Sequence, residues 1–144
     1  MRLAIKVIHY FIITGLLFSL TACVKTHQGH GITSYKVKGK VYTPLRSARG
    51  YKARGLASFY SKRLHNHKTS NGERYNMYSL TAAHTTLPFN TRVRVKNVKN
   101  GRTVVVRIND RGPFYSSRII DISNAAARRL GITSTSMVEI KALN

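Results

Sequence analysis

Residues 104–114 read Val-Val-Val-Arg-Ile-Asn-Asp-Arg-Gly-Pro-Phe, an apolar run that ends in an acidic residue and a glycine-proline pair. The run predicts a buried strand that ends near Asp110. A carboxylate at such a position loses part of its hydration, while Asn109 and Arg111 can hydrogen-bond it, and these opposed effects suit a proton-transfer group. The alternative is a plain turn, because Asn-Asp before Arg-Gly-Pro is typical turn composition. Asp110 is nevertheless a candidate for chemistry, as one of only four acidic residues.

Short strands and one helix are predicted around this stretch. An Asn-Gly pair at residues 100–101 predicts a hairpin turn into the strand at 103–108. Ser123 can cap a helix over residues 124–130, which Gly131 ends. Strand patterns occur at residues 56–59, 79–84, 93–98, 103–108, 119–122 and 137–143.

Strands of this number and length favour one closed barrel over a sandwich, because closure leaves no exposed sheet edge. The predicted fold class is therefore mainly β, a six-stranded barrel with one or two short helices. Residues 61–77 are predicted to be a long polar loop. Residues 35–42 are predicted to form a short strand or hairpin that leads into the compact domain, which is expected to span residues 55–144.

The N-terminal 22 residues resemble a lipoprotein signal peptide. Arg2 and Lys6 precede a short apolar stretch, and Leu20-Thr21-Ala22-Cys23 has the order of a bacterial lipobox. Cys23 is the only cysteine, so it cannot form an internal disulfide, and lipidation explains its presence better than a structural role does. The alternatives are a transmembrane anchor and a chance cysteine near an ordinary cleavage site. Residues 23–54 are expected to be the lipidated cysteine and a basic tether.

The charge is strongly positive, with 25 Lys and Arg against four acids and a formal net charge of +21. Inside a cell this balance would favour nucleic acid as a partner. An exported protein instead meets anionic polymers of the cell envelope. No specific nucleic-acid partner is expected, and a monomer is the expected oligomeric state.

Several short motifs, taken in their order and spacing, resemble the RlpA-like (rare lipoprotein A) family. The stretches that carry the resemblance are residues 55–60 (Gly-Leu-Ala-Ser-Phe-Tyr), 69–73 (Thr-Ser-Asn-Gly-Glu), 80–84 (Leu-Thr-Ala-Ala-His), 106–114 (Val-Arg-Ile-Asn-Asp-Arg-Gly-Pro-Phe) and 118–123 (Arg-Ile-Ile-Asp-Ile-Ser). The resemblance runs from about Tyr35 to the C-terminus. It implies a double-psi β-barrel, with which the strand count is compatible.

The resemblance also implies lytic transglycosylation of peptidoglycan, which cuts between N-acetylmuramic acid and N-acetylglucosamine without water and leaves a 1,6-anhydromuramyl end. This chemistry needs an acid for the glycosidic oxygen and a base for the muramyl C6 hydroxyl. By the family's pattern the catalytic candidates are Asp110, Glu73 and His84. Asp110 is preferred as acid and base, while Glu73 and His84 would position sugar hydroxyls or tune it.

Further residues are candidates for substrate binding: Asp121, Asn109, Arg111, Tyr60 and Phe114. Each assignment has a simpler alternative. Glu73 could be a solvated turn residue, His84 could satisfy core hydrogen bonds, and Asp121 could compete with Ser123 for the helix N-cap. The alternative function is a non-catalytic, expansin-like lipoprotein that binds peptidoglycan glycan strands.

A metal site is the remaining alternative, because His65 and His67 would share one face of an extended strand. Zinc sites usually need three or four ligands, and no third ligand has a recognisable spacing. No metal or cofactor is therefore expected. Since Val24, rather than an aspartate, follows Cys23, the expected location is the outer membrane, facing the periplasm.

Overall fold

The computed structural model describes residues 33–115 and 117–143. The predicted signal peptide, Cys23 and the first part of the tether lie outside the described residues. The elements are β1 (Tyr35–Val37), β2 (Lys40–Tyr42), β3 (Lys52–Phe59), the 3-10 helix η1 (Lys62–Leu64), β4 (Thr81–Ala83), β5 (Arg92–Asn97), β6 (Thr103–Asp110), β7 (Arg118–Ile122), α1 (Asn124–Leu130) and β8 (Ser136–Ala142).

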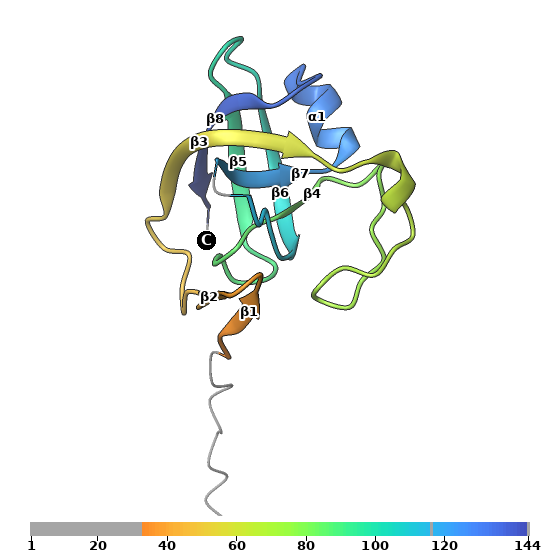
Figure 1. The fold of residues 1–144 in the computed structure, drawn as a ribbon. Coiled ribbons are helices and arrows are strands. Elements are labelled where there is room, and N and C mark those ends of the chain that lie inside the picture. The colour runs from red at the N-terminus through yellow and green to blue at the C-terminus, as the bar shows by residue number, and fades with distance from the viewer. Residues whose placement is uncertain (1–32, 116, 144) are drawn as a thin grey trace, which may run out of the picture. The chain divides into compact units, whose positions relative to one another are not determined.

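Six of these strands form a closed barrel in the order β3-β7-β4-β6-β5-β8 (Figure 1). The pairs β3–β7 and β4–β6 are parallel, and the other neighbours are antiparallel. Within the described ranges, one α-helix and one 3-10 helix accompany the barrel. The predicted fold class, a mainly β six-stranded barrel with one or two short helices, is confirmed.

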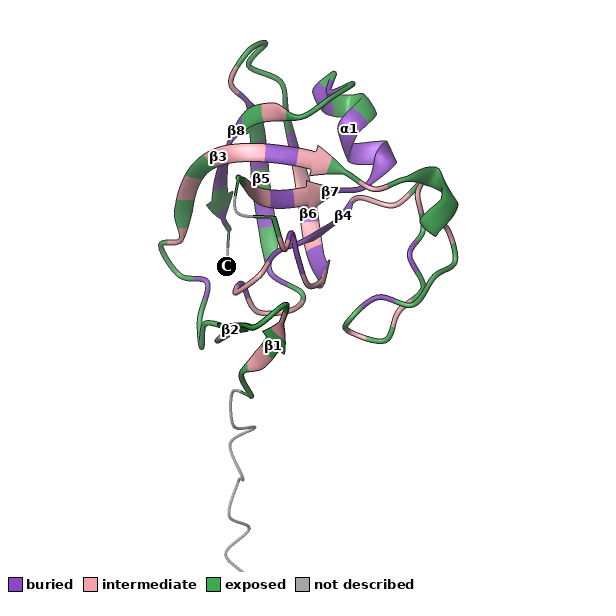
Figure 2. Cartoon of the chain, viewed as in Figure 1, coloured by how far each residue is buried: buried purple, intermediate pink, exposed green. Residues whose placement is uncertain are grey.

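The core follows from side-chain alternation along the strands. Residues of β5 alternate between exposed and buried (Figure 2). Val93 and Val95 are fully buried. Val106 and Ile108 of β6 face the same interior, since alternate residues of a strand point to one side. Every described side chain of the core cluster lies between Ala48 and Ala142. The described residues from 33 onward belong to one compact unit, so a fragment that begins at Gly31 keeps this complete core.

The predicted turn and helix ends are confirmed. Gly101 has a positive φ of 74° in the hairpin that joins β5 to β6. Ser123 caps α1 by accepting a hydrogen bond from Ala126 N at 3.2 Å, and Gly131 ends the helix in the left-handed conformation. Asp121 lies inside β7, where it is paired with Ala83 of β4, and the N-cap of α1 is Ser123. The alternative that Asp121 caps the helix is therefore wrong.

Strand bounds differ from the sequence-based expectation by one or more residues, and those of β3 and β4 differ most. Strand β3 begins at Lys52, before the start expected at Leu56, because its first outward residues are charged and hide the strand pattern. Strand β4 is confined to Thr81–Ala83 within the expected 79–84 segment. The predicted hairpin at 35–42 is present as β1 and β2. In the described ranges no helix is long and apolar enough to cross a membrane.

Candidate active site

Two of the four acids are brought together by three neighbouring strands, β6, β4 and β7. Ala83 of β4 is paired with Asp110 at the end of β6 and with Asp121 of β7. Directly paired residues project to the same side of a sheet, and neighbouring strands lie about 4.8 Å apart. The two carboxylates therefore flank a single methyl group, on backbones roughly 10 Å apart. The pairing thus places two acids on strands that both neighbour β4.

The carboxylate of Asp110 is held by four donors. Oδ1 accepts hydrogen bonds from Ser70 N at 2.8 Å, Ser70 Oγ at 2.6 Å and Arg111 N at 2.8 Å. Oδ2 accepts from the Tyr60 hydroxyl at 2.8 Å. Burial, together with the charge of Asp110, raises the pKa of Tyr60, so this hydroxyl stays protonated and donates. The orientation of the Asp110 carboxylate is thus fixed before any substrate binds.

The environment of the Asp121 carboxylate is dominated by burial instead of hydrogen bonds. The side chain is 19% exposed, and Arg118 lies 3.4 Å from Oδ1 as an ion-pair partner. Oδ1 nevertheless has no hydrogen bond of good geometry within the described structure. Burial raises the pKa of Asp121, an effect that Arg118 opposes and Asp110 reinforces. Asp121 is therefore easier to protonate than an ordinary aspartate.

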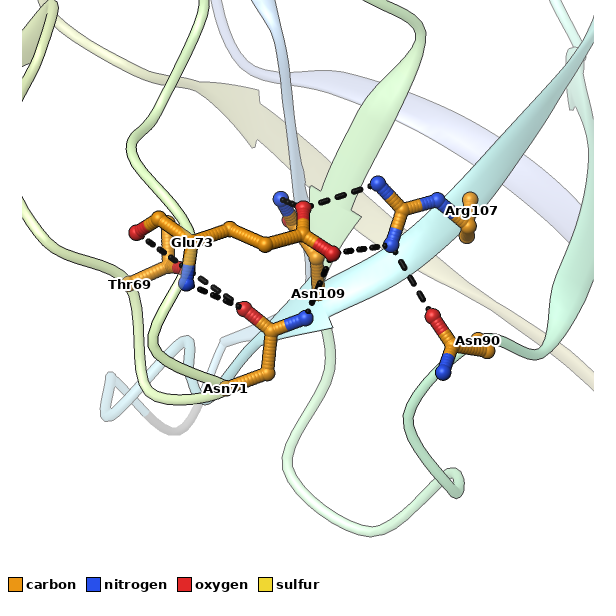
Figure 3. A network of polar contacts seen from close by, with 6 residues as sticks. All are labelled: Thr69, Asn71, Glu73, Asn90, Arg107 and Asn109. Carbon is orange, nitrogen blue, oxygen red and sulfur yellow. Dashed lines mark hydrogen bonds and ion pairs between the residues drawn. The ribbon is translucent and has the colours of Figure 1, made fainter.

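Glu73 lies in a polar network between the loop after β3 and strand β6 (Figure 3). Its two carboxylate oxygens accept from Arg107 at 2.7 and 2.8 Å, and Asn109 and Asn71 donate to it at 3.0 and 2.9 Å. The hydrogen bonds from Arg107 and Asn109 lower the pKa of Glu73 to about 2. Glu73 is thus ionised at neutral pH and cannot donate a proton there.

The Glu73 network also positions the loop that contacts Asp110. Thr69 Oγ1 donates to Asn71 Oδ1 at 2.7 Å and to the Glu73 carbonyl at 3.1 Å. Ser70, between these residues, supplies two of the four donors to Asp110. The Glu73–Arg107 pair therefore fixes the loop against β6 so that Ser70 reaches Asp110.

We expect Glu73→Gln to change the acid stability of the protein in one pH window. The lowered pKa of Glu73 stabilises the fold above pH 4.5, the ordinary value, and this contribution is lost as the pH falls towards about 2. The difference in unfolding free energy between wild type and Glu73→Gln should be constant above this window and shrink within it. Urea unfolding over a pH series measures it. A difference that does not change with pH would contradict the assigned network.

His84 is buried, with 2% of its surface exposed. Nδ1 accepts from the backbone N–H groups of Thr86 at 3.1 Å and Leu87 at 3.0 Å, and Nε2 bonds the Tyr51 hydroxyl at 3.1 Å. Because Nδ1 accepts twice, the ring is neutral with its proton on Nε2. Burial and then Arg111 lower the pKa of His84 to about 4, which agrees with this form. This geometry favours the alternative of a histidine that satisfies core hydrogen bonds.

In the described structure the hydrogen bonds of the Arg111 guanidinium go to backbone carbonyls and not to the carboxylate of Asp110. The guanidinium donates to the carbonyls of His84 at 3.1 Å and Leu87 at 2.7 Å, and it lies 3.9 Å from the ring centre of Phe89. Burial lowers the pKa of Arg111. Arg111 and His84 therefore hold the segment after β4 against the end of β6, next to Asp110.

The aromatic candidates Tyr60 and Phe114 are both engaged in packing. Tyr60 stacks on Tyr75 at 4.7 Å between ring centres. Phe114 meets the rings of Tyr35 and Tyr42 edge-on, at 6.3 and 5.6 Å. The hairpin β1–β2 thus packs on the loop that follows Asp110, and Phe114 retains only intermediate exposure for a sugar.

His65 and His67 have no cluster of metal-ligand side chains around them in the described part of the chain. His65 Nδ1 accepts a hydrogen bond from Met77 N at 3.2 Å. Among the residues that the structure describes, no three His, Cys, Asp or Glu side chains gather as metal ligands would. His65 therefore has a local structural role.

Comparison with known proteins adds the family to this geometry. The DPBB_1 family, described as lytic transglycolase, matches residues 52–142. The chain belongs to the RlpA family. Endolytic peptidoglycan transglycosylase RlpA of Pseudomonas aeruginosa strain PAO1 is 51% identical over 107 residues, 74% of this chain and 31% of that protein. The protein of the same name from Neisseria meningitidis strain MC58 is 50% identical over 125 residues, 85% of this chain and 52% of that protein.

The chain therefore spans about a third to a half of the length of these curated relatives. Solved structures support the fold. Streptomyces papain inhibitor superposes with a TM-score of 0.54 at 22% identity, covering 66% of this chain and 96% of its own. An expansin from Clavibacter michiganensis gives 0.52 at 19% identity, covering 65% and 51%. The expected double-psi β-barrel and the RlpA resemblance are confirmed.

Three residues of this RlpA-family site were not found from the sequence. Ser70 donates to Asp110, Arg107 pairs with Glu73, and Tyr51 bonds His84. Only Arg107 had a local signal, because it lies two residues from Asn109 on one strand and alternate strand residues share a face. Ser70 and Tyr51 contact partners far away in the sequence.

Proposed function

We propose that this protein is a peptidoglycan lytic transglycosylase that cleaves the bond between N-acetylmuramic acid and N-acetylglucosamine to 1,6-anhydromuramyl ends. The pair of carboxylates on either side of Ala83 is the observation that carries the proposal. Relatives at about half identity are endolytic peptidoglycan transglycosylases by name, which supports the substrate class. The biological role would be remodelling of the cell wall.

The proton transfers divide between the two aspartates in this proposal. Sequence reasoning assigned both steps to Asp110. Asp110, whose carboxylate is held in a fixed orientation by four hydrogen bonds, would remove the proton from the muramyl C6 hydroxyl. Asp121, which burial makes easier to protonate, would donate a proton to the leaving glycosidic oxygen. The C6 oxygen then bonds to C1 as the C1–O bond to the leaving sugar breaks.

In this proposal the other candidate residues hold the segments around Asp110 in place and transfer no proton. Glu73 holds the loop that carries Ser70, and His84 with Arg111 holds the segment after β4. Asn109 is buried and donates to Glu73, so it belongs to the same support. Tyr60 orients the Asp110 carboxylate. Phe114 packs against the hairpin β1–β2 and so holds the loop that follows Asp110.

The test is incubation of the fragment from Gly31 with intact sacculi and with peptide-stripped sacculi, followed by mass spectrometry of the released sugars. Anhydromuramyl products would support the transglycosylase. Reducing-end products would mean a hydrolase. If the fragment sediments with sacculi but releases no sugar, the alternative function holds, which is an expansin-like binder of glycan strands.

A lipid anchor at Cys23 is part of the same proposal and rests on the sequence alone. The lipobox-like Leu20-Thr21-Ala22-Cys23 string supports it, as does the absence of any other cysteine. A peptidoglycan enzyme acts in the cell envelope, and an anchor here would hold it at the outer membrane, facing the periplasm. Labelled palmitate should enter the full-length protein and be absent from Cys23→Ser. Equal labelling of the full-length protein and of Cys23→Ser would contradict a lipid anchor at Cys23.

A further inference from the structure

One outer face of the barrel carries a dense set of cations. The face is formed by β3, β8 and β5, which are neighbours in the barrel order (Figure 1). We call it the cationic face, and it consists of Lys52, Arg54, Arg94, Lys96 and Lys141, all exposed. These side chains line a groove together with Ala53, Glu139 and Ile140.

Strand register arranges these cations in two rows. Lys52 is paired with Lys141, which is paired in turn with Arg94, so the first row is three cations side by side. In the second row Glu139 lies between Arg54 and Lys96. Neighbours in a row are about 5 Å apart, and the two rows are separated by roughly 7 Å along the strands.

This arrangement does not stabilise the barrel. Like charges directly opposite each other on paired strands destabilise a sheet. The contacts of Glu139 to Arg54 at 4.0 Å and to Lys96 at 3.9 Å are long and solvent-exposed, and such pairs contribute little. The first row has no acid as a cross-strand neighbour. The repulsion among its three cations is therefore not offset by a neighbouring acid until an anionic partner binds.

The cationic face lies on the opposite side of the barrel from the two aspartates. Asp110 and Asp121 belong to β6 and β7, on either side of β4. In the closed order β3-β7-β4-β6-β5-β8, strand β8 is three places from β4 in either direction. A glycan strand bound between the aspartates would therefore not cover the cationic face.

We propose that the cationic face binds the phosphate groups of an anionic phospholipid surface while the opposite side of the barrel works on glycan. The choice of a membrane as the partner rests on the proposed function. If the side of the barrel with Asp110 and Asp121 faces the cell wall, the cationic face on the far side is directed away from the wall. Lysine and arginine near an anionic bilayer each add to its attraction. Here five of them are fixed on a rigid sheet.

The experiment measures sedimentation of the fragment from Gly31, which has no cysteine to lipidate, with vesicles of phosphatidylglycerol and phosphatidylethanolamine. The test variant is Lys52→Gln/Arg94→Gln/Lys141→Gln. Its affinity for these vesicles should fall about a hundredfold, which corresponds to the loss of three well-placed cations. Phosphatidylcholine vesicles should bind neither protein, and added salt should weaken the binding of the wild type.

The matched control is Lys62→Gln/Arg63→Gln/Lys68→Gln, which removes the same charge from exposed residues of the loop after β3. Its vesicle affinity should fall only severalfold. Equal losses in the two variants would overturn the proposal, because net charge alone would then explain binding. Binding to sacculi but not to vesicles would also overturn it and make the face a wall contact.

Two further readouts separate this site from the fold and from catalysis. The test variant should have a higher Tm than the wild type at low salt, because it relieves the repulsion within the first row. Its release of sugars from soluble glycan fragments should be unchanged. Failure of the glycan assay with intact vesicle binding would thus reject the proposed enzyme and not the cationic face.

Discussion

Asp110→Asn is expected to lower the rate of glycan cleavage about a thousandfold, within the range that removal of a general base produces. Asparagine keeps an oxygen that can accept from Ser70 and from Arg111 N, so the loop contact should persist. It cannot take the proton from the C6 hydroxyl. The variant should therefore still bind sacculi but no longer release sugars from them. Rates of sugar release and pelleting, measured on the same preparations, check both halves of this expectation.

The chain provides a matched control in its fourth acid. Glu139 lies on the outer face of β8, away from the aspartate pair, and Glu139→Gln should keep cleavage within about twofold. Asp121→Asn should lose cleavage as severely as Asp110→Asn does. An Asp110→Asn protein that retains more than about a tenth of the rate would show that Asp110 does not transfer the proton.

A second large effect is expected from His84 in the stability of the protein towards acid. Folding lowers the pKa of His84 from 6.5 to about 4, because the neutral ring is buried and hydrogen-bonded. The unfolded chain then binds the proton more readily, so this contribution is present above pH 6.5 and is lost as the pH falls to about 4. The shift corresponds to roughly 3 kcal/mol of unfolding free energy.

The variant His84→Asn isolates this effect. Its side-chain oxygen can accept from the N–H groups of Thr86 and Leu87, as Nδ1 does, but it does not titrate. The unfolding free energy of the variant should be less dependent on pH between 6.5 and 4 than that of the wild type. Protonation of Asp121, whose pKa is raised, acts in the opposite direction in both proteins and cancels in the comparison. Equal pH slopes would contradict the neutral, buried His84.

Much of the barrel could be predicted because its signals are local. The alternation at Val93 and Val95, the Asn-Gly turn and the Ser123 cap each depend on residues close together in the chain. The start of β3 was harder, because Lys52 and Arg54 face outward and leave few apolar residues to reveal the strand. Sequence periodicity therefore identified the elements better than their ends.

The site depended on contacts that no local pattern reports. Parallel pairing of β4 with β6 and antiparallel pairing of β4 with β7 place Ala83 between the two aspartates. Glu73 looked like a solvated turn residue until Arg107, 34 positions away, supplied its partner. Motif resemblance named these residues without giving their contacts. The closed sheet suggests the proposed division of roles, because Asp110 and Asp121 lie on strands that neighbour β4 while Glu73 and His84 bond the surrounding loops.

The most direct test of the central claim, cleavage between two aspartates without water, is digestion of peptide-stripped sacculi in water enriched in oxygen-18. The released muramyl ends should be anhydro sugars that carry no heavy oxygen, since the C6 hydroxyl replaces water as the attacking group. Their formation should require both Asp110 and Asp121. Reducing ends that carry the heavy oxygen would contradict the account and identify water as the nucleophile.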